Sequence, residues 1–105
     1  MNFIVKSDPF VQGLPRDVVI KLLECKRAPD KATQAKYHRT PHFAMLKEAA
    51  LALYQTCAIC GRPDGEKAGM TVHHRGGSYA HLFCEHLTRD IILVCSRCHA
   101  HIHRK

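Results

Sequence analysis

The amino-acid sequence predicts a small α+β domain in which N-terminal helices pack on a compact hairpin and a short C-terminal helix. Two observations support this fold class. Apolar residues recur at helical spacing in the first half of the chain, and an apolar, β-branched run leads into the second of two Cys-x-x-Cys pairs. A chain of 105 residues fits one domain. Small cores bury a modest share of the surface, so domains of this size often add a metal or a disulfide.

The first 39 residues are expected to form an arm followed by a helix. Met1–Gly13 has no apolar period, which indicates an extended arm. Pro15 suits the first position of a helix, where its missing N–H has no helical partner. The helical apolar pattern is expected to end near Arg27, because Pro29 disfavours helix at the residue before it. Asp30–Arg39 is polar and basic and is interpreted as a loop or a loose helical turn.

A second helix is predicted at Pro41–Gln55. Thr40 can cap its N-terminus, and proline is tolerated at the first helical position. One apolar face follows at helical spacing: Phe43, Leu46, Ala50 and Leu53. We expect this face to pack into the core rather than to bind a partner. The helix opens residues 40–105, which contain the functional motifs.

Short β elements and a last helix are expected after residue 55. A tight turn begins at Cys57. Met70–His74 and Ile91–Cys95 are predicted strands, and the second is apolar enough to be buried. Arg75–Glu85 is interpreted as a loop, and Cys98–Lys105 as a short terminal helix.

Four of the six cysteines fall in two Cys-x-x-Cys pairs: Cys57 with Cys60, and Cys95 with Cys98. Each pair can bind one side of a tetrahedral ion, and zinc is favoured because it accepts four thiolates without redox chemistry. The sequence therefore predicts a structural zinc site. Two disulfides are the alternative, but no secretory signal is visible and a reducing cytoplasm is expected. Cys25 and Cys84 are left over and are expected to be buried or free thiols.

The chain is basic, with 16 Lys and Arg against 9 Asp and Glu and a formal charge of +7 at pH 7. This balance suits a polyanionic partner such as a phosphate backbone. A membrane is not an expected partner, because the apolar runs are too short to span a bilayer and no stretch is both basic and apolar on one face. Nothing in the sequence identifies a dimer surface, so the oligomeric state stays open.

In the second half of the chain, several histidines lie close in sequence to the cysteine pairs. His99 and His103 are four residues apart, so on a helix they share one face and can reach one cation. His73 and His74 point to opposite faces of a strand, so one can bind a metal while the other acts elsewhere. Phosphodiester hydrolysis needs a cation to neutralise the phosphate and a base to activate water. Mg²⁺, Mn²⁺ or another divalent ion could serve.

Three segments resemble the HNH nucleases, also called ββα-metal or His-Me finger enzymes: Val72-His73-His74, Asp90–Cys95 and Cys98-His99-x3-His103. More narrowly, they resemble the members that have a four-cysteine zinc site. Two further patterns are similar to the family, Tyr37-x2-Thr40-Pro41-x-Phe43-x2-Leu46 and Tyr79-x2-Leu82-x2-Glu85. The resemblance covers about Tyr37–Lys105. It implies a ββα-metal finger and an endonuclease activity.

The resemblance also implies a role for each matching residue. His74 would be the general base that activates water. His73, His99 and His103 would hold the catalytic divalent ion, His103 either as a ligand or as a phosphate contact. Asp90 stands where the family often has asparagine, and there it would brace the loop that carries His74. Aspartate can accept a hydrogen bond for this purpose but cannot donate one as an amide does.

Basic residues around the predicted site are expected to bind phosphates and set the register of the substrate: Arg75, Arg89, Arg97, Arg104 and Lys105. DNA is the expected substrate, ahead of RNA, from the resemblance alone. Two alternatives stay open. One is a non-catalytic zinc-binding module that docks on nucleic acid, and the other is a degenerate nuclease that serves as a protein-interaction domain.

Overall fold

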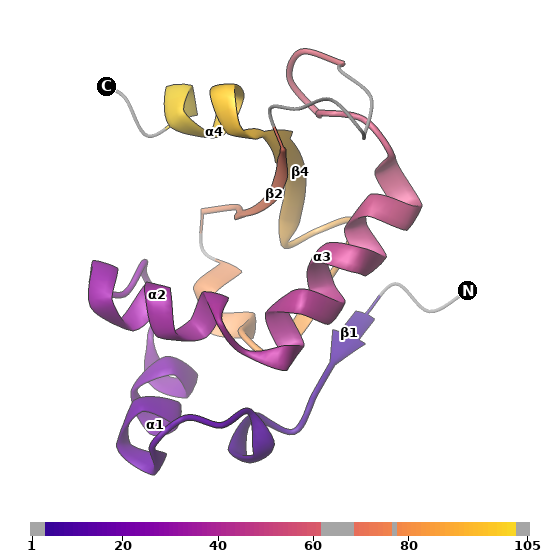
Figure 1. The fold of residues 1–105 in the computed structure, drawn as a ribbon. Helices are drawn as coiled ribbons and strands as arrows, with labels where there is room; N and C mark the ends of the chain where they lie inside the picture. The colour runs from indigo at the N-terminus through magenta and orange to yellow at the C-terminus, as the bar shows by residue number, and fades with distance from the viewer. Residues whose placement is uncertain (1–3, 62–68, 77, 103–105) are drawn as a thin grey trace.

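A computed structural model describes residues 4–61, 69–76 and 78–102, and within these ranges it has the predicted α+β fold. The helices are α1 (Arg16–Glu24), α2 (Lys31–His38), α3 (Pro41–Tyr54) and α4 (Ser96–Ile102). The strands are β1 (Ile4–Lys6), β2 (Met70–His74), β3 (Cys84–His86) and β4 (Ile91–Cys95). In Figure 1 the chain passes from α1 through α2 and the long α3 to the β2–β4 hairpin and α4.

Helix α3 begins and ends where the sequence predicted, within one residue. The Thr40 side chain accepts a hydrogen bond from the Phe43 N–H at 3.2 Å, which satisfies one of the free donors at the N-terminus. Gln55 follows the last helical residue with a left-handed φ of 64°, and its N–H bonds the Leu51 carbonyl at 3.1 Å. The helix therefore has a defined start and a defined end.

Helix α2 corrects the prediction for Asp30–Arg39, which was a loop or a loose helical turn, because Lys31–His38 forms a regular helix. Asp30 caps the helix by accepting bonds from the Thr33 N–H at 3.4 Å and the Thr33 hydroxyl at 2.6 Å. Tyr37 is buried at 3% exposure, so tertiary packing stabilises a segment whose apolar content is too low to predict a helix. This helix brings additional side chains to the candidate site.

Two other helix boundaries differ from the prediction. Helix α1 ends at Glu24 rather than near Arg27, because Cys25 is extended (φ −74°, ψ 137°). The Cys25 thiol donates to the Leu22 carbonyl at 3.1 Å and approaches the Tyr79 carbonyl at 3.6 Å, which fixes the turn. Helix α4 begins at Ser96, two residues before the predicted start, so the second cysteine pair spans a strand end and a helical turn.

The two predicted strands pair as an antiparallel hairpin, β2 with β4. Met70 lies opposite Cys95 and His74 lies opposite Ile91, so the register runs through all five residues of each strand. Burial along β2 alternates, with Val72 and His74 buried and His73 half-buried between them. The two neighbouring histidines therefore face opposite sides of the strand, as a period of two requires.

The N-terminal arm is not a free extension. Strand β1 pairs antiparallel with β3, and the Ser7 N–H bonds the Phe83 carbonyl at 2.9 Å. The segment Arg75–Glu85, predicted as a loop, contains a 3₁₀ turn at Ser78–His81 and the first part of β3. The arm and this segment stabilise one another through backbone hydrogen bonds, which no local pattern in either stretch could predict.

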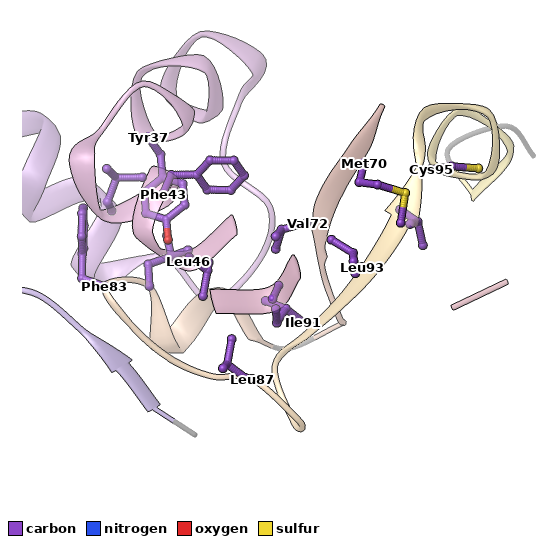
Figure 2. Packing of buried hydrophobic residues seen from close by; sticks show 14 of the residues in the cluster. Tyr37, Phe43, Leu46, Met70, Val72, Phe83, Leu87, Ile91, Leu93 and Cys95 are labelled. Carbon is purple, nitrogen blue, oxygen red and sulfur yellow. The ribbon is translucent and has the colours of Figure 1, made fainter. Parts of the chain in front are cut away.

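One hydrophobic core joins the helices to the hairpin (Figure 2). Leu46 and Leu93 have 0% exposure, and they come from α3 and β4 respectively. Tyr37, Phe43 and Phe83 lie at the helical end of the core, with Met70 and Cys95 at its other end. Because the core supports β2 on its inner side, it also fixes the position of His74. No helix in the described part of the chain is long and apolar enough to cross a membrane.

Candidate metal centre and histidine pocket

The two cysteine pairs meet at one end of the hairpin. The Sγ atoms of the four predicted ligands all lie within 4.8 Å of one another: Cys57, Cys60, Cys95 and Cys98. The Cys60 and Cys95 sulfurs are 3.7 Å apart. Four thiolates at about 2.3 Å from a tetrahedral zinc ion would be about 3.8 Å apart, so the cluster fits zinc. All six cysteines of the chain have free thiols, so the disulfide alternative is not observed.

Backbone geometry builds the first half of this cluster. The Ile59 N–H points at the Cys57 sulfur at 3.4 Å, and Gly61 closes the turn by donating to the Cys57 carbonyl at 3.0 Å. Gly61 has a φ of 76°, which glycine adopts without strain. The Ala58 N–H bonds the Leu93 carbonyl at 2.8 Å and ties the turn to β4. The turn is therefore already shaped for a metal ion.

The thiols differ in their readiness to ionise. Burial opposes ionisation of Cys57, but backbone hydrogen bonds from Cys60 and Cys95 outweigh it and lower its pKa to about 6. A backbone hydrogen bond from Cys98 lowers the pKa of Cys95. A hydrogen bond with Cys95, together with burial, raises the pKa of the Cys98 thiol to about 12. Of these three thiols Cys57 therefore ionises readily, whereas Cys98 resists ionisation.

Zinc binding is expected to release about one proton or more per ion at neutral pH, because Cys98 must lose its proton before it coordinates. Apparent affinity should therefore rise with pH and fall as the medium is acidified. Titration calorimetry in two buffers of different ionisation enthalpy measures the proton count. Cys84→Ser, which removes an exposed thiol outside the cluster, should leave the count unchanged. Proton-independent binding would contradict this arrangement.

A second group of side chains surrounds a small open pocket between α2, β2 and α4. We call it the histidine pocket, and its lining is Gln34, His38, Val72, His73, His74, Tyr79 and His99. The His73 and His99 rings meet edge-on with centroids 5.5 Å apart. Although His73 and His74 alternate along β2, both line this pocket, so the structure brings three of the four predicted histidines to one place. His103 lies outside the described residues, as do Arg104 and Lys105.

His38 reaches the same pocket from α2, and sequence reasoning assigned it no role. Its ring packs on Phe43 with centroids 4.5 Å apart. Burial lowers the pKa of His38, and the nearby His74 and His99 lower it further. A neutral imidazole therefore faces the pocket at neutral pH. Because this segment was interpreted as a loop or a loose helical turn, the sequence pattern did not place His38 at the site.

The ring of His74 is buried at 5% exposure and is held on two sides. It stacks on Tyr79 with centroids 5.5 Å apart and planes inclined by 28°. Its Nε2 lies 2.8 Å from Glu85 Oε2. Since Glu85 engages Nε2, the nitrogen left to exchange a proton with a substrate is Nδ1.

Glu85 is fully buried and binds three partners. Its Oε1 lies 2.6 Å from His42 Nε2, and its Oε2 receives the Tyr37 hydroxyl in addition to His74. Burial opposes ionisation of Glu85, but hydrogen bonds from His42 and His74 outweigh it and hold its pKa below the ordinary value. His42 Nδ1 lies 2.7 Å from the Ser7 hydroxyl. We call Ser7, Tyr37, His42, Glu85 and His74 the glutamate network.

Asp90 is buried and is not among the residues that line the pocket. Its carboxylate accepts bonds from the His86 N–H at 2.7 Å and the Ser78 hydroxyl at 3.3 Å, and its own carbonyl accepts the Arg75 N–H at 2.8 Å. Burial opposes its ionisation, but the hydrogen bond from Arg89 helps lower the pKa of Asp90. These contacts close the loop that begins directly after His74.

None of the three predicted phosphate-binding arginines that the structure describes lines the histidine pocket. Arg75 follows His74 and is exposed, while Arg89 is 62% exposed and bonds Asp90 through Nε at 3.1 Å. Arg97 lies on α4 and lines a separate apolar hollow with Ile59 and Ile102. Arg75, Arg89 and Arg97 are therefore exposed residues outside the lining of the histidine pocket.

No protein-family model, curated protein or solved structure matches this chain. The HNH resemblance therefore rests on the motif residues themselves. The fold class and a cysteine cluster that fits zinc are established by the geometry.

Proposed function

We propose that this protein is a metal-dependent endonuclease of the HNH type that hydrolyses phosphodiester bonds in DNA. One observation carries the proposal. His74 is buried on β2 with Nε2 engaged by Glu85, and it lines a pocket together with His73 and His99. A base with one nitrogen anchored, set beside two further imidazoles, is the arrangement that water activation near a cation requires.

In the proposed reaction His74 acts as the general base. Its Nδ1 accepts a proton from a water molecule as the water oxygen attacks phosphorus and the bond to the leaving oxygen breaks. His73 and His99, whose rings meet in the pocket, would hold a divalent ion. When bound, such an ion neutralises charge on the phosphate and stabilises the leaving oxygen. These two histidines do not complete a ligand set, so phosphate oxygens, and His103, would supply the remaining ligands.

We assign zinc to the four-cysteine cluster, in a structural role. The cluster joins the turn after α3 to the junction of β4 and α4, and α4 carries His99. With four thiolate ligands the coordination shell is closed, so no position is left for a substrate. Zinc would therefore hold His99 against His73 without entering the chemistry.

DNA as substrate follows from the family resemblance and is supported by the charge of +7. The exposed Arg75, Arg89 and Arg97 would contact the backbone at several phosphates rather than at one. Binding is therefore expected to weaken steeply as salt rises, because each neutralised phosphate releases counterions.

Conversion of supercoiled plasmid by the purified, zinc-loaded protein tests the proposal. We expect nicked or linear product with Mg²⁺ or Mn²⁺ and none with EDTA, because the ion in the pocket is needed to stabilise the leaving oxygen. Zinc content measured after the EDTA incubation shows whether the structural ion was also removed. The absence of cleavage with every metal, in folded and zinc-loaded protein, would contradict the nuclease.

The second candidate is a non-catalytic zinc module that binds nucleic acid. One observation favours it: among the described residues, only the four cysteines bring three or more metal-binding groups together. Salt-sensitive binding to DNA without cleavage, unaffected by substitution of His74, would support the module over the nuclease.

A further inference from the structure

We propose that Glu85 is a positioning residue that sets which ring nitrogen of His74 carries the proton, and that Tyr37 and His42 hold Glu85 in place for this purpose. The catalytic consequence rests on the proposed nuclease function. The tautomer itself is a property of the folded chain. It can be measured whether or not the protein cleaves DNA.

The contacts of Glu85 decide the direction of each hydrogen bond. Oε2 meets both His74 Nε2 at 2.8 Å and the Tyr37 hydroxyl, and Oε1 meets His42 Nε2 at 2.6 Å. An ionised carboxylate can only accept, so all three partners must donate to it. His74 therefore carries its proton on Nε2 and presents the lone pair on Nδ1. The opposite tautomer would place two acceptors against each other.

Because these groups are buried, the opposite tautomer of His74 would be costly. Glu85 and His42 both have 0% exposure, so water cannot replace a lost partner. An unmatched buried polar pair is costly, whereas a fully satisfied network rigidifies its members. In the described part of the chain no buried side-chain nitrogen or oxygen lacks a partner. The lower pKa of Glu85 agrees with an ionised carboxylate.

The network also extends beyond the histidine pocket. His42 is on α3 and reaches Ser7 through Nδ1 at 2.7 Å, while Tyr37 is on α2. Since Ser7 Oγ can donate or accept, it can match either state of Nδ1 without disturbing the bond to Glu85. The N-terminal segments therefore anchor a carboxylate that acts on β2.

Ring ¹⁵N chemical shifts of His74, measured in mildly alkaline buffer, test the tautomer directly. We expect a protonated Nε2 and an unprotonated Nδ1 in the wild-type protein. This measurement needs no variant to fold and no activity. A wild-type His74 protonated on Nδ1 would overturn the proposal, even if the protein proves to be a nuclease.

Glu85→Gln tests the cause. The amide can donate to Nε2, so we expect His74 to shift toward the Nδ1–H form and cleavage to fall about 10²–10⁴-fold in kcat, with KM little changed. Cys84→Ser, which changes an exposed neighbour of Glu85 on β3 and leaves the carboxylate and its partners in place, is the control and should preserve the Nε2–H tautomer. A purely structural role predicts a lower Tm for Glu85→Gln with the tautomer and kcat unchanged, and that outcome would overturn the proposal. A shifted tautomer in a protein that never cleaves DNA would support the positioning role and contradict the nuclease.

Discussion

His74→Gln is expected to lower the rate of plasmid cleavage about 10²–10⁴-fold while the protein stays folded, because general-base assistance contributes a factor of that size. Glutamine suits the position better than alanine. Its amide can donate to Glu85 much as the His74 Nε2 does, so the buried carboxylate keeps a partner. It has no group that titrates near neutral pH, so it cannot accept a proton from water. Initial rates with Mg²⁺ or Mn²⁺, alongside a thermal melt, measure the effect.

His101→Gln is the matched control for this experiment. His101 lies on α4, is exposed and is not part of the histidine pocket. The His101→Gln variant should cleave plasmid at the wild-type rate. If the folded His74→Gln variant cleaves plasmid at the wild-type rate, His74 is not the general base. Loss of cleavage in His74→Gln alone, with DNA binding retained, separates the nuclease from the binding module.

Cys57→Ser is expected to cost most of the folding free energy and to abolish tight zinc binding. Cys57 is 2% exposed and has the thiol pKa of about 6 that makes it ready to coordinate at neutral pH. Serine offers an oxygen that stays protonated under these conditions. Structural zinc sites are worth about 10–16 kcal/mol in apparent binding free energy, which is comparable with the whole stability of a small domain, about 5–15 kcal/mol. Metal analysis and circular dichroism measure both effects.

Cys84→Ser is the control for the zinc prediction, since Cys84 is an exposed thiol on β3 and outside the cluster. It should retain about one zinc ion per chain and melt like the wild type. A well-folded Cys57→Ser protein, or a well-folded wild type that contains no zinc, would contradict a structural zinc site.

The parts of the fold that the sequence predicted are those with strong local signals. Helix Pro41–Gln55 was defined by Thr40 and a regular apolar stripe, and the structure ends it at Tyr54. Met70–His74 and Ile91–Cys95 were predicted strands, and both have those bounds. The cysteine cluster was predictable because two short spacings fix the geometry of each half, whatever the chain does between them.

The parts that sequence reasoning missed depend on contacts between distant segments. Helix α2 is weakly apolar and is stabilised by the capping of Asp30 and the burial of Tyr37. His42 and Glu85 lie 43 positions apart and meet in the core. Glu85 belongs to a pattern that was noted in the sequence, but its burial has no local signature, since a carboxylate is normally placed on the surface and only its three partners make burial tolerable. The candidate ligands could thus be predicted from the sequence, but the long-range contacts that orient them could not.

The pairing of β1 with β3 has a consequence for how the chain folds during synthesis. Ile4 lies opposite His86, so strand β1 pairs with a strand that is synthesised much later than itself. Translation over that interval takes on the order of several seconds, during which the N-terminal strand has no partner. The four cysteines complete their cluster later still, since Cys98 follows β4. The helices α1 to α3 can therefore form early, whereas the glutamate network and the metal cluster can be completed only after β3 and α4 have been made.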